Sequence, residues 1–195
     1  MININEVIDF FDSLADKWDD MEIKNDKIIN IILDNAGIGK GCKVLDVACG
    51  TGILIPYYIN KDVAKVTAVD ISPKMVEIAR SKFGNIENVD ILCSDVEECE
   101  FDTGFDNIVI YNAFPHFQDA DRLIKCLSSK LVQGGKLTVA HGMSRAKIDA
   151  HHKGSAMQVS NGLMEAEDLA EIFSRYLKVT VIRSDDDMYQ VVGIK

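Results

Sequence analysis

An acidic residue followed by a glycine-bearing turn is the feature of this sequence with the clearest chemical meaning. Residues 44–52 read as a buried strand that delivers Asp46 at its carboxyl end, followed by a turn that contains Gly50 and Gly52. Glycine lets a backbone approach a ligand closely, and a helix beginning near residue 53 offers free N–H groups. Ligands of open parallel sheets bind beyond the carboxyl ends of the strands. This run therefore predicts a ligand-binding loop; a glycine-rich turn without a ligand is the structural alternative.

Two further carboxylates follow expected strands in the same way. Asp70 ends the second strand, and Asp95 follows the third. In nucleoside-binding α/β folds a carboxylate at the end of the second strand accepts hydrogen bonds from ribose hydroxyls. The alternative for Asp70 is an interaction with the dipole of the next helix, but Ser72 already caps that helix. We therefore expect Asp70 to face a ligand, with Ile71 beside it.

The four histidines fall in three segments that follow expected strands or helices. His116 comes after the fourth strand and His141 after the fifth, while His151 or His152 ends a helix that begins after Ser144. Imidazole acts as a general base near neutral pH, so we assign His116 and His141 as catalytic residues; a solvated loop histidine is the alternative for His116. A bound metal is another interpretation, but the spacing is not H-x-x-x-H and no carboxylate ligands are specified. No metal ligand is assigned.

Short β-rich runs alternate with helical stretches along the chain, which predicts βαβ units and a parallel sheet. Two final runs are joined by the four residues 184–187, and so tight a connection forces them to pair antiparallel. We expect one domain over residues 1–195, with a seven-stranded, mostly parallel sheet. The expected strands are 43–47, 63–69, 89–93, 105–111, 136–140, 177–183 and 188–194.

Composition narrows the class of protein. The formal net charge is −10, with 31 acidic against 21 basic side chains, which disfavours nucleic acid and anionic membranes as partners. No apolar run approaches the roughly 20 residues of a membrane span, and the start lacks the features of a signal peptide. The five cysteines include no C-x-x-C pair and are expected as reduced thiols. We expect a cytoplasmic protein without a membrane span.

The loop at residues 44–52 resembles motif I of the class I S-adenosylmethionine-dependent methyltransferases, and in particular the acid-x-Ala-Cys-Gly-Thr-Gly form of the ubiquinone/menaquinone-biosynthesis type. The resemblance implies a Rossmann-like α/β fold with helices on both faces of the sheet and a C-terminal antiparallel hairpin. It also implies that Asp46 serves the methionyl amino group of the cofactor, and that the turn passes beside it at Ala48, Gly50 and Gly52. Ala48 departs from the usual first glycine. A dinucleotide-binding loop would need a third glycine where Ile55 stands.

The same resemblance assigns roles to later residues. It implies that Asp70 binds the ribose, that Ile71 packs on the adenine, and that Asp95 meets the adenine amino group. Val96 would offer its backbone N–H to the ring, and Asn112 joins these residues as a cofactor contact.

Two variable segments are expected to shape the rest of the site. Residues 10–19, which hold the only tryptophan, Trp18, resemble the start of the quinone-biosynthesis-type enzymes. The resemblance implies that helices within residues 1–36 cap the cofactor site and exclude water, although a plain packed helix is a serious alternative. Residues 111–117 lack the Asn/Asp-Pro-Pro-aromatic pattern of many enzymes that methylate nucleobases or glutamine.

These features together predict methyl transfer from S-adenosylmethionine to a small-molecule acceptor, leaving S-adenosylhomocysteine. The specific motifs serve the cofactor, and the variable segments are too short to form a large inserted substrate domain, which favours a small acceptor. A regulatory or partner-binding module that binds S-adenosylmethionine without catalysis is the alternative. A nucleotide-linked oxidoreductase is disfavoured by the loop. The acceptor atom and the oligomeric state stay open.

Overall fold

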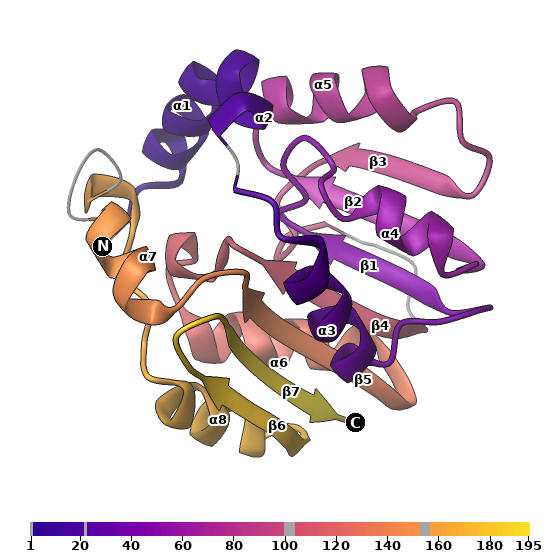
Figure 1. The fold of residues 1–195 in the computed structure, drawn as a ribbon, viewed down its shortest axis with the longest axis vertical. Coiled ribbons are helices and arrows are strands. Elements are labelled where there is room, and N and C mark those ends of the chain that lie inside the picture. Colours follow the sequence, from indigo (N-terminus) through magenta and orange to yellow (C-terminus); the bar gives the residue numbers. More distant parts are fainter. Residues whose placement is uncertain (1, 22, 100–103, 153–156) are drawn as a thin grey trace.

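A seven-stranded sheet runs through the protein in the order β3-β2-β1-β4-β5-β7-β6 (Figure 1). The computed structural model describes residues 2–21, 23–99, 104–152 and 157–195, with the backbone alone for residues 149–152 and 157. The strands are β1 (Lys43–Val47), β2 (Lys65–Asp70), β3 (Val89–Cys93), β4 (Phe105–Tyr111), β5 (Leu131–His141), β6 (Lys178–Ser184) and β7 (Tyr189–Ile194). Strand β7 pairs antiparallel with both of its neighbours, β5 and β6, and the pairs among β1 to β5 are parallel. The predicted C-terminal hairpin is confirmed.

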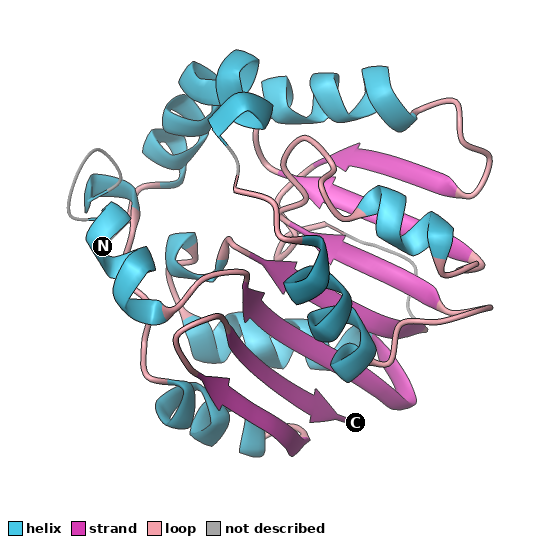
Figure 2. Ribbon diagram, in the orientation of Figure 1, coloured by secondary structure: helices cyan, strands magenta, loops and turns pink. Residues whose placement is uncertain are grey.

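Helices flank both faces of this sheet (Figure 2). They are α1 (Ile4–Leu14), α2 (Trp18–Met21), α3 (Asp26–Ala36), α4 (Ile55–Asn60), α5 (Pro73–Phe83), α6 (Ala120–Lys130), α7 (Arg145–His152) and α8 (Ala166–Ser174), with short 3-10 turns at Ala15–Lys17, Phe114–His116 and Met157–Val159. As expected, Ser72 caps α5 by accepting a hydrogen bond from the Met75 N–H, and Pro73 occupies its first turn. Gly37 ends α3 in the left-handed region.

Alternation along the strands divides the core into two layers. In β4, Ile108 and Ile110 pack with α6 and α8 on one face, whereas Val109 and Tyr111 pack with α3, α4 and α5 on the other. Successive side chains of a strand point to opposite faces, so the buried run of β4 serves both layers. The α/β prediction with helices on both faces is confirmed.

The start of β5 differs from the expected strand at residues 136–140. Leu131 already pairs with Phe105 at the beginning of β4, and the register then shifts so that Asn107 pairs with Lys136. Gly134, with a φ of 82°, therefore lies in an irregularity within β5 rather than in a turn before it. Residues 131–135 belong to the strand because Leu131 pairs with Phe105 of β4. A local sequence pattern does not reveal a pairing with a distant strand.

Other boundaries agree to within about two residues, as expected for helix ends that fray. Gly154, a glycine that could end the helix expected after Ser144, lies outside the described residues. Within the described parts of the chain, no helix combines the length and the apolar character that crossing a bilayer requires.

Candidate active site

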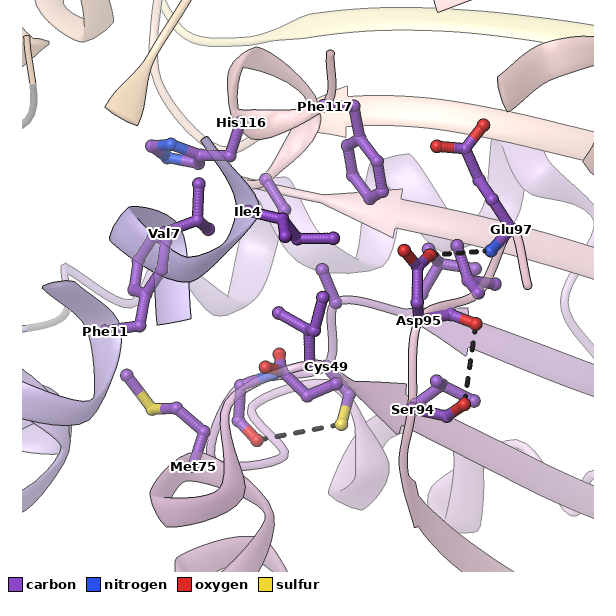
Figure 3. A pocket seen from close by; sticks show the side chains of 18 of the residues that line it. Ile4, Val7, Phe11, Cys49, Met75, Ser94, Asp95, Glu97, His116 and Phe117 are labelled. Atoms are coloured by element: carbon purple, nitrogen blue, oxygen red, sulfur yellow. Dashed lines mark hydrogen bonds between the residues drawn. The ribbon is translucent and has the colours of Figure 1, made fainter. Parts of the chain in front are cut away.

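A cavity of about 320 Å³ opens at the carboxyl edge of the sheet. Its wall combines the loop after β1, the end of β2, and the loops after β3 and β4, and α1 contributes residues from across the opening. In Figure 3, His116 and Phe117 lie at one end of the cavity, Met75 and Ser94 at the other, and Ile4 between them. Parallel strands β1, β2 and β4 bring these loops together because their carboxyl ends share one edge.

The glycine-bearing loop after β1 forms part of this wall. Ala48 and Gly50 both have a φ of 55° and Gly52 has a φ of 91°, a left-handed conformation that favours glycine. A Cβ atom added at Gly50 would meet only the Trp18 Nε1 atom, at 3.8 Å, so the backbone there faces open cavity. At Gly52 a Cβ atom would lie 2.8 Å from the Phe83 ring. Gly52 does not line the cavity. A glycine is needed at this position because the backbone packs closely against Phe83 of α5.

Asp70 joins this loop to the end of β2. Its carboxylate accepts hydrogen bonds from the Gly50 N–H at 2.8 Å and the Ser72 N–H at 2.9 Å. Burial raises the pKa of Asp70, and these backbone N–H groups oppose that effect. A carboxylate has about four lone-pair sites, so the two bonds leave capacity for hydroxyl donors from the cavity that Asp70 lines.

Asp46 is turned away from the cavity. Its side chain is buried on the α4 face of the sheet, near the Tyr58 hydroxyl, and neither Asp46 Oδ2 nor that hydroxyl has an aligned hydrogen-bond partner among the described residues. Burial raises the pKa of Asp46 to about 8, the Tyr58 hydroxyl partly opposes this, and the charge of Asp70 adds to it. Burial therefore favours the protonated form of Asp46 in the folded protein.

The remaining residues assigned to the cofactor line the cavity. Ile71 follows Asp70, and Asp95 and Val96 lie after β3. Asp95 Oδ1 accepts a hydrogen bond from the Glu97 N–H at 2.9 Å, which fixes this turn. Asn112, with a φ of 56°, accepts a bond from the Gly142 N–H at 3.0 Å and so ties the end of β4 to β5.

His116 lies in the cavity wall after β4. Its Nδ1 atom is 2.7 Å from the Val159 carbonyl oxygen, and a carbonyl only accepts, so Nδ1 carries the proton. In the neutral form of this tautomer, the ring carries its lone pair on Nε2. Asn161 holds the same loop from the side, because its N–H donates to Pro115 O and its Nδ2 donates to Phe117 O, both at 2.9 Å.

The sequence matches a methyltransferase domain family over residues 44–135. The chain is 34% identical over 114 residues to a malonyl-[acyl-carrier protein] O-methyltransferase of Acetivibrio thermocellus, which covers 57% of this chain. It is 33% identical over 157 residues, or 73% of this chain, to a ubiquinone/menaquinone biosynthesis C-methyltransferase of Shewanella woodyi. The chain spans 40% and 61%, respectively, of the lengths of these two relatives.

Solved structures share the fold over nearly the whole chain. A chain from the complex of a Haloferax volcanii methyltransferase activator with a methyltransferase aligns with a TM-score of 0.82 at 20% identity, covering 96% of both chains. The N-methyltransferase NodS of Bradyrhizobium japonicum, solved with S-adenosyl-l-homocysteine, aligns with a TM-score of 0.65 at 16% identity over 87% of this chain and 84% of its own. This chain carries a class I S-adenosylmethionine-dependent methyltransferase domain.

The second histidine assigned to catalysis lies outside the cavity lining of this methyltransferase domain. His141, at the end of β5, is 3% exposed, and its ring contacts the Tyr189 ring edge-on at 6.0 Å. The side chains of His151 and His152 lie outside the described residues, so their convergence stays untested. Among the residues whose side chains are described, no three His, Cys, Asp or Glu residues form a group that could hold a metal ion.

The N-terminal segment of the methyltransferase domain, residues 2–21, is joined to both sides of the cavity. On one side, Asp12 accepts a hydrogen bond from the Ser72 hydroxyl, and Asp19 accepts one from the Thr51 hydroxyl. On the other, the Gln118 side chain donates to the Ile2 carbonyl at 2.7 Å. These contacts join segments that are far apart in sequence.

Aromatic contacts complete this connection. The Phe11 ring meets the His116 ring edge-on, with centroids 4.9 Å apart, and the Trp18 ring at 5.5 Å. The sequence carries no signal for the contact between Phe11 and His116, because the two residues lie on distant segments of the chain. The pairing of Arg122 with Glu97 at the cavity mouth was likewise missed, because its two members lie on different elements.

The donors and acceptors present suit S-adenosylmethionine. The loop at Gly50 has backbone open to the cavity, which a side chain would fill, and Asp70 and Asp95 supply acceptors after β2 and β3. Four carboxylates line the cavity against one guanidinium, a balance that suits a cationic sulfonium ligand. They are Asp70, Asp95, Glu97 and Glu98, with Arg122 as the cation.

Proposed function

We propose that this chain binds S-adenosylmethionine in the cavity and catalyses methyl transfer to a small-molecule acceptor. The observation that carries the proposal is the hydrogen bond from the Gly50 N–H to the Asp70 carboxylate on the wall of the cavity. It joins the loop that would pass beside the cofactor to the acid that would bind its ribose. When bound, the cofactor supplies a methyl group on a sulfonium, whose sulfur takes the bonding electrons when the methyl group leaves.

Two sets of residues divide the work in this proposal. The cofactor half of the cavity consists of Gly50, Asp70, Ile71, Asp95 and Val96. Asp70 would accept hydrogen bonds from the ribose hydroxyls, Ile71 would pack on the adenine, and Asp95 with the Val96 N–H would meet its edge. Ala48 and Asn112 would border the methionyl part of the cofactor. Asp46 would support the loop from beneath instead of contacting the cofactor, because its carboxyl group faces Tyr58.

The acceptor half consists of Ile4, Val7, Phe11, His116 and Phe117. His116 would act as general base through Nε2, because its Nδ1 proton is held by Val159. The acceptor atom would give its proton to Nε2 and its electron pair to the methyl carbon. Helix α1 would exclude water from this half.

We further propose that the protein works in the cytosol. All five cysteines are free thiols, as expected in a reducing compartment. Cell fractionation with an antibody against the protein tests this location. Recovery in a secreted or periplasmic fraction would contradict it.

Calorimetric titration of the purified protein with S-adenosylmethionine and S-adenosylhomocysteine tests the main proposal, with NADH as the control ligand. We expect micromolar binding of both sulfur compounds and no saturable binding of NADH. A preference for NADH, or no binding of either sulfur compound, would overturn it.

A further inference from the structure

We infer that Asn161 is a positioning residue for the proposed base. Together with Val159 it clamps the turn that carries His116, and it holds the imidazole in the tautomer whose Nε2 atom accepts a proton. This inference rests on the proposed function and deepens it, because it identifies what prepares His116 for catalysis. Asn161 lies outside the cavity lining, so it acts through His116 and not on the cofactor or the acceptor.

The clamp joins two short segments that are far apart in sequence. Asn161 donates its backbone N–H to the Pro115 carbonyl and its side-chain Nδ2 to the Phe117 carbonyl, both at 2.9 Å. Between these two bonds, His116 Nδ1 donates in the opposite direction, to the Val159 carbonyl at 2.7 Å. The residues on both sides of His116 are therefore fixed to the same segment that receives its ring proton.

The direction of the third bond decides the chemistry of the ring. A carbonyl oxygen only accepts, so the bond to Val159 requires the proton on Nδ1. The hydrogen bond that one ring nitrogen makes sets the tautomer of a neutral histidine, and the Val159 carbonyl thus keeps Nε2 as the accepting nitrogen. A turn that moved away from Val159 would allow the other tautomer, in which Nε2 is protonated and cannot take a proton from an acceptor.

The clamp segment is itself held against the N-terminal helix. Val159 is 3% exposed and packs with Val7 of α1 in a small apolar cluster. The Phe11 ring of the same helix meets the His116 ring edge-on, with an angle of 89° between the two planes (Figure 3). Packing therefore fixes the place of the Val159 carbonyl, and Phe11 restricts the rotation of the imidazole. Asn161 supplies the connection between that carbonyl and the backbone beside His116.

The tautomer of His116 is measurable without a substrate. Purified protein labelled with ¹⁵N is studied by two-bond ¹H–¹⁵N spectra of the imidazole rings at about pH 8, above the usual histidine pKa of about 6.5. The ring signals that disappear in His116→Gln belong to His116. We expect the wild-type protein to show a protonated Nδ1 and an unprotonated Nε2 in this ring. A predominance of the Nε2-protonated tautomer would overturn the inference.

Two matched asparagine variants isolate the clamp. Asn161→Ala removes the amide that donates to Phe117, whereas Asn30→Ala removes an exposed amide that donates to the Asp26 carbonyl of α3. In Asn161→Ala the ratio of the Nε2-protonated to the Nδ1-protonated tautomer should rise about two- to tenfold, the range of one hydrogen bond of ordinary net strength. Asn30→Ala should leave the ratio unchanged. An unchanged ratio in Asn161→Ala, or an equal rise in both variants, would overturn the inference.

Asn161→Asp provides a second variant, because an ionised carboxylate keeps the shape of the side chain but has no proton to donate. It should raise the tautomer ratio as Asn161→Ala does, and a wild-type ratio would contradict the clamp. Calorimetry with S-adenosylhomocysteine tests the proposed function separately. All three asparagine variants should keep the wild-type affinity, since neither asparagine lines the cavity. No binding by the wild-type protein would refute the proposed function, whereas weaker binding in the Asn161 variants alone would overturn the inference.

Discussion

The cofactor half of the cavity is held by backbone groups close to the sheet, whereas the acceptor half is assembled from side chains of distant segments. Asp70 receives two backbone N–H groups, from Gly50 and Ser72. His116, in contrast, takes its orientation from Val159, and Phe11 reaches it from the N-terminal helix. The cofactor half therefore depends on a few consecutive residues at strand ends.

This difference explains why one half is recognisable in the sequence and the other is not. A loop with fixed backbone geometry needs particular residue types at fixed spacing. A wall of side chains can be built from many combinations of apolar residues. The acceptor half is thus the region in which relatives of one fold can differ in substrate.

The largest expected effect concerns Asp46, the buried acid beneath the cofactor half. Its pKa is raised to about 8, whereas an unfolded aspartate has a pKa of about 3.9. The folded state therefore binds the extra proton between these values, and its stability should fall as the pH rises, by at most about 1.4 kcal/mol per pH unit. Asp46→Asn should remove this decline in denaturant titrations between about pH 5 and pH 8.

Asp90→Asn is the matched control, since Asp90 is an exposed acid paired with Lys65. It should leave the pH dependence of the unfolding free energy unchanged. A slope that persists in Asp46→Asn would show that another group causes it.

The second prediction separates packing from ligand contact within the loop. Gly52→Ala should lower the unfolding free energy by about 2–4 kcal/mol, because the new Cβ meets Phe83 and the backbone is left-handed. Gly41 has a similar φ of 83° but open space around it. Gly41→Ala should therefore cost only the backbone part, about 1–2 kcal/mol. Thermal and denaturant unfolding measure the loss in each variant. If Gly52→Ala and Gly41→Ala lose the same unfolding free energy, the contact with Phe83 does not contribute.

The third prediction concerns the acid on the cavity wall. Asp70→Asn should weaken S-adenosylhomocysteine binding by about 1–3 kcal/mol, because a strong hydrogen-bond acceptor is lost. His116→Gln should leave that affinity near the wild-type value, since His116 belongs to the acceptor half. Calorimetry on both variants measures the contrast. A larger loss in His116→Gln would mean that the two halves are assigned the wrong way round.

The smallest expected effect is at Ala48, a non-glycine residue with a φ of 55°. Ala48→Gly relieves the left-handed strain but adds freedom to the unfolded chain. The relief of strain stabilises the folded state about as much as the added freedom stabilises the unfolded chain. The unfolding free energy should therefore change by less than about 1 kcal/mol. A large loss of unfolding free energy in chemical denaturation would show that the Ala48 methyl group makes stabilising contacts in the folded protein.

The sequence was sufficient to predict the architecture of the sheet and much of the cavity wall. The four residues between β6 and β7 required an antiparallel hairpin, and strand ends located the carboxylates. Eight of the assigned residues line the cavity, namely Ala48, Gly50, Asp70, Ile71, Asp95, Val96, Asn112 and His116. Their roles toward a cofactor or acceptor stay predictions.

The residues that the sequence misplaced relative to the cavity lie within or at the ends of strands. Asp46 shares a face with Val44, against α4, and His141 shares a face with Val139, against Tyr189. Alternation along a strand turns both side chains into the packed layers. The partners of α1 were equally unpredictable, because contacts such as Asp12 with Ser72 join residues 60 positions apart.

A crystal structure of the protein with S-adenosylhomocysteine tests the central claim most directly. We expect the ribose hydroxyls to lie within hydrogen-bonding distance of the Asp70 carboxylate, the adenine to lie between Ile71 and Val96, and the sulfur to face His116. A nucleoside bound among Ile4, Val7 and Phe117, or outside the cavity, would contradict the division of the site into a cofactor half and an acceptor half.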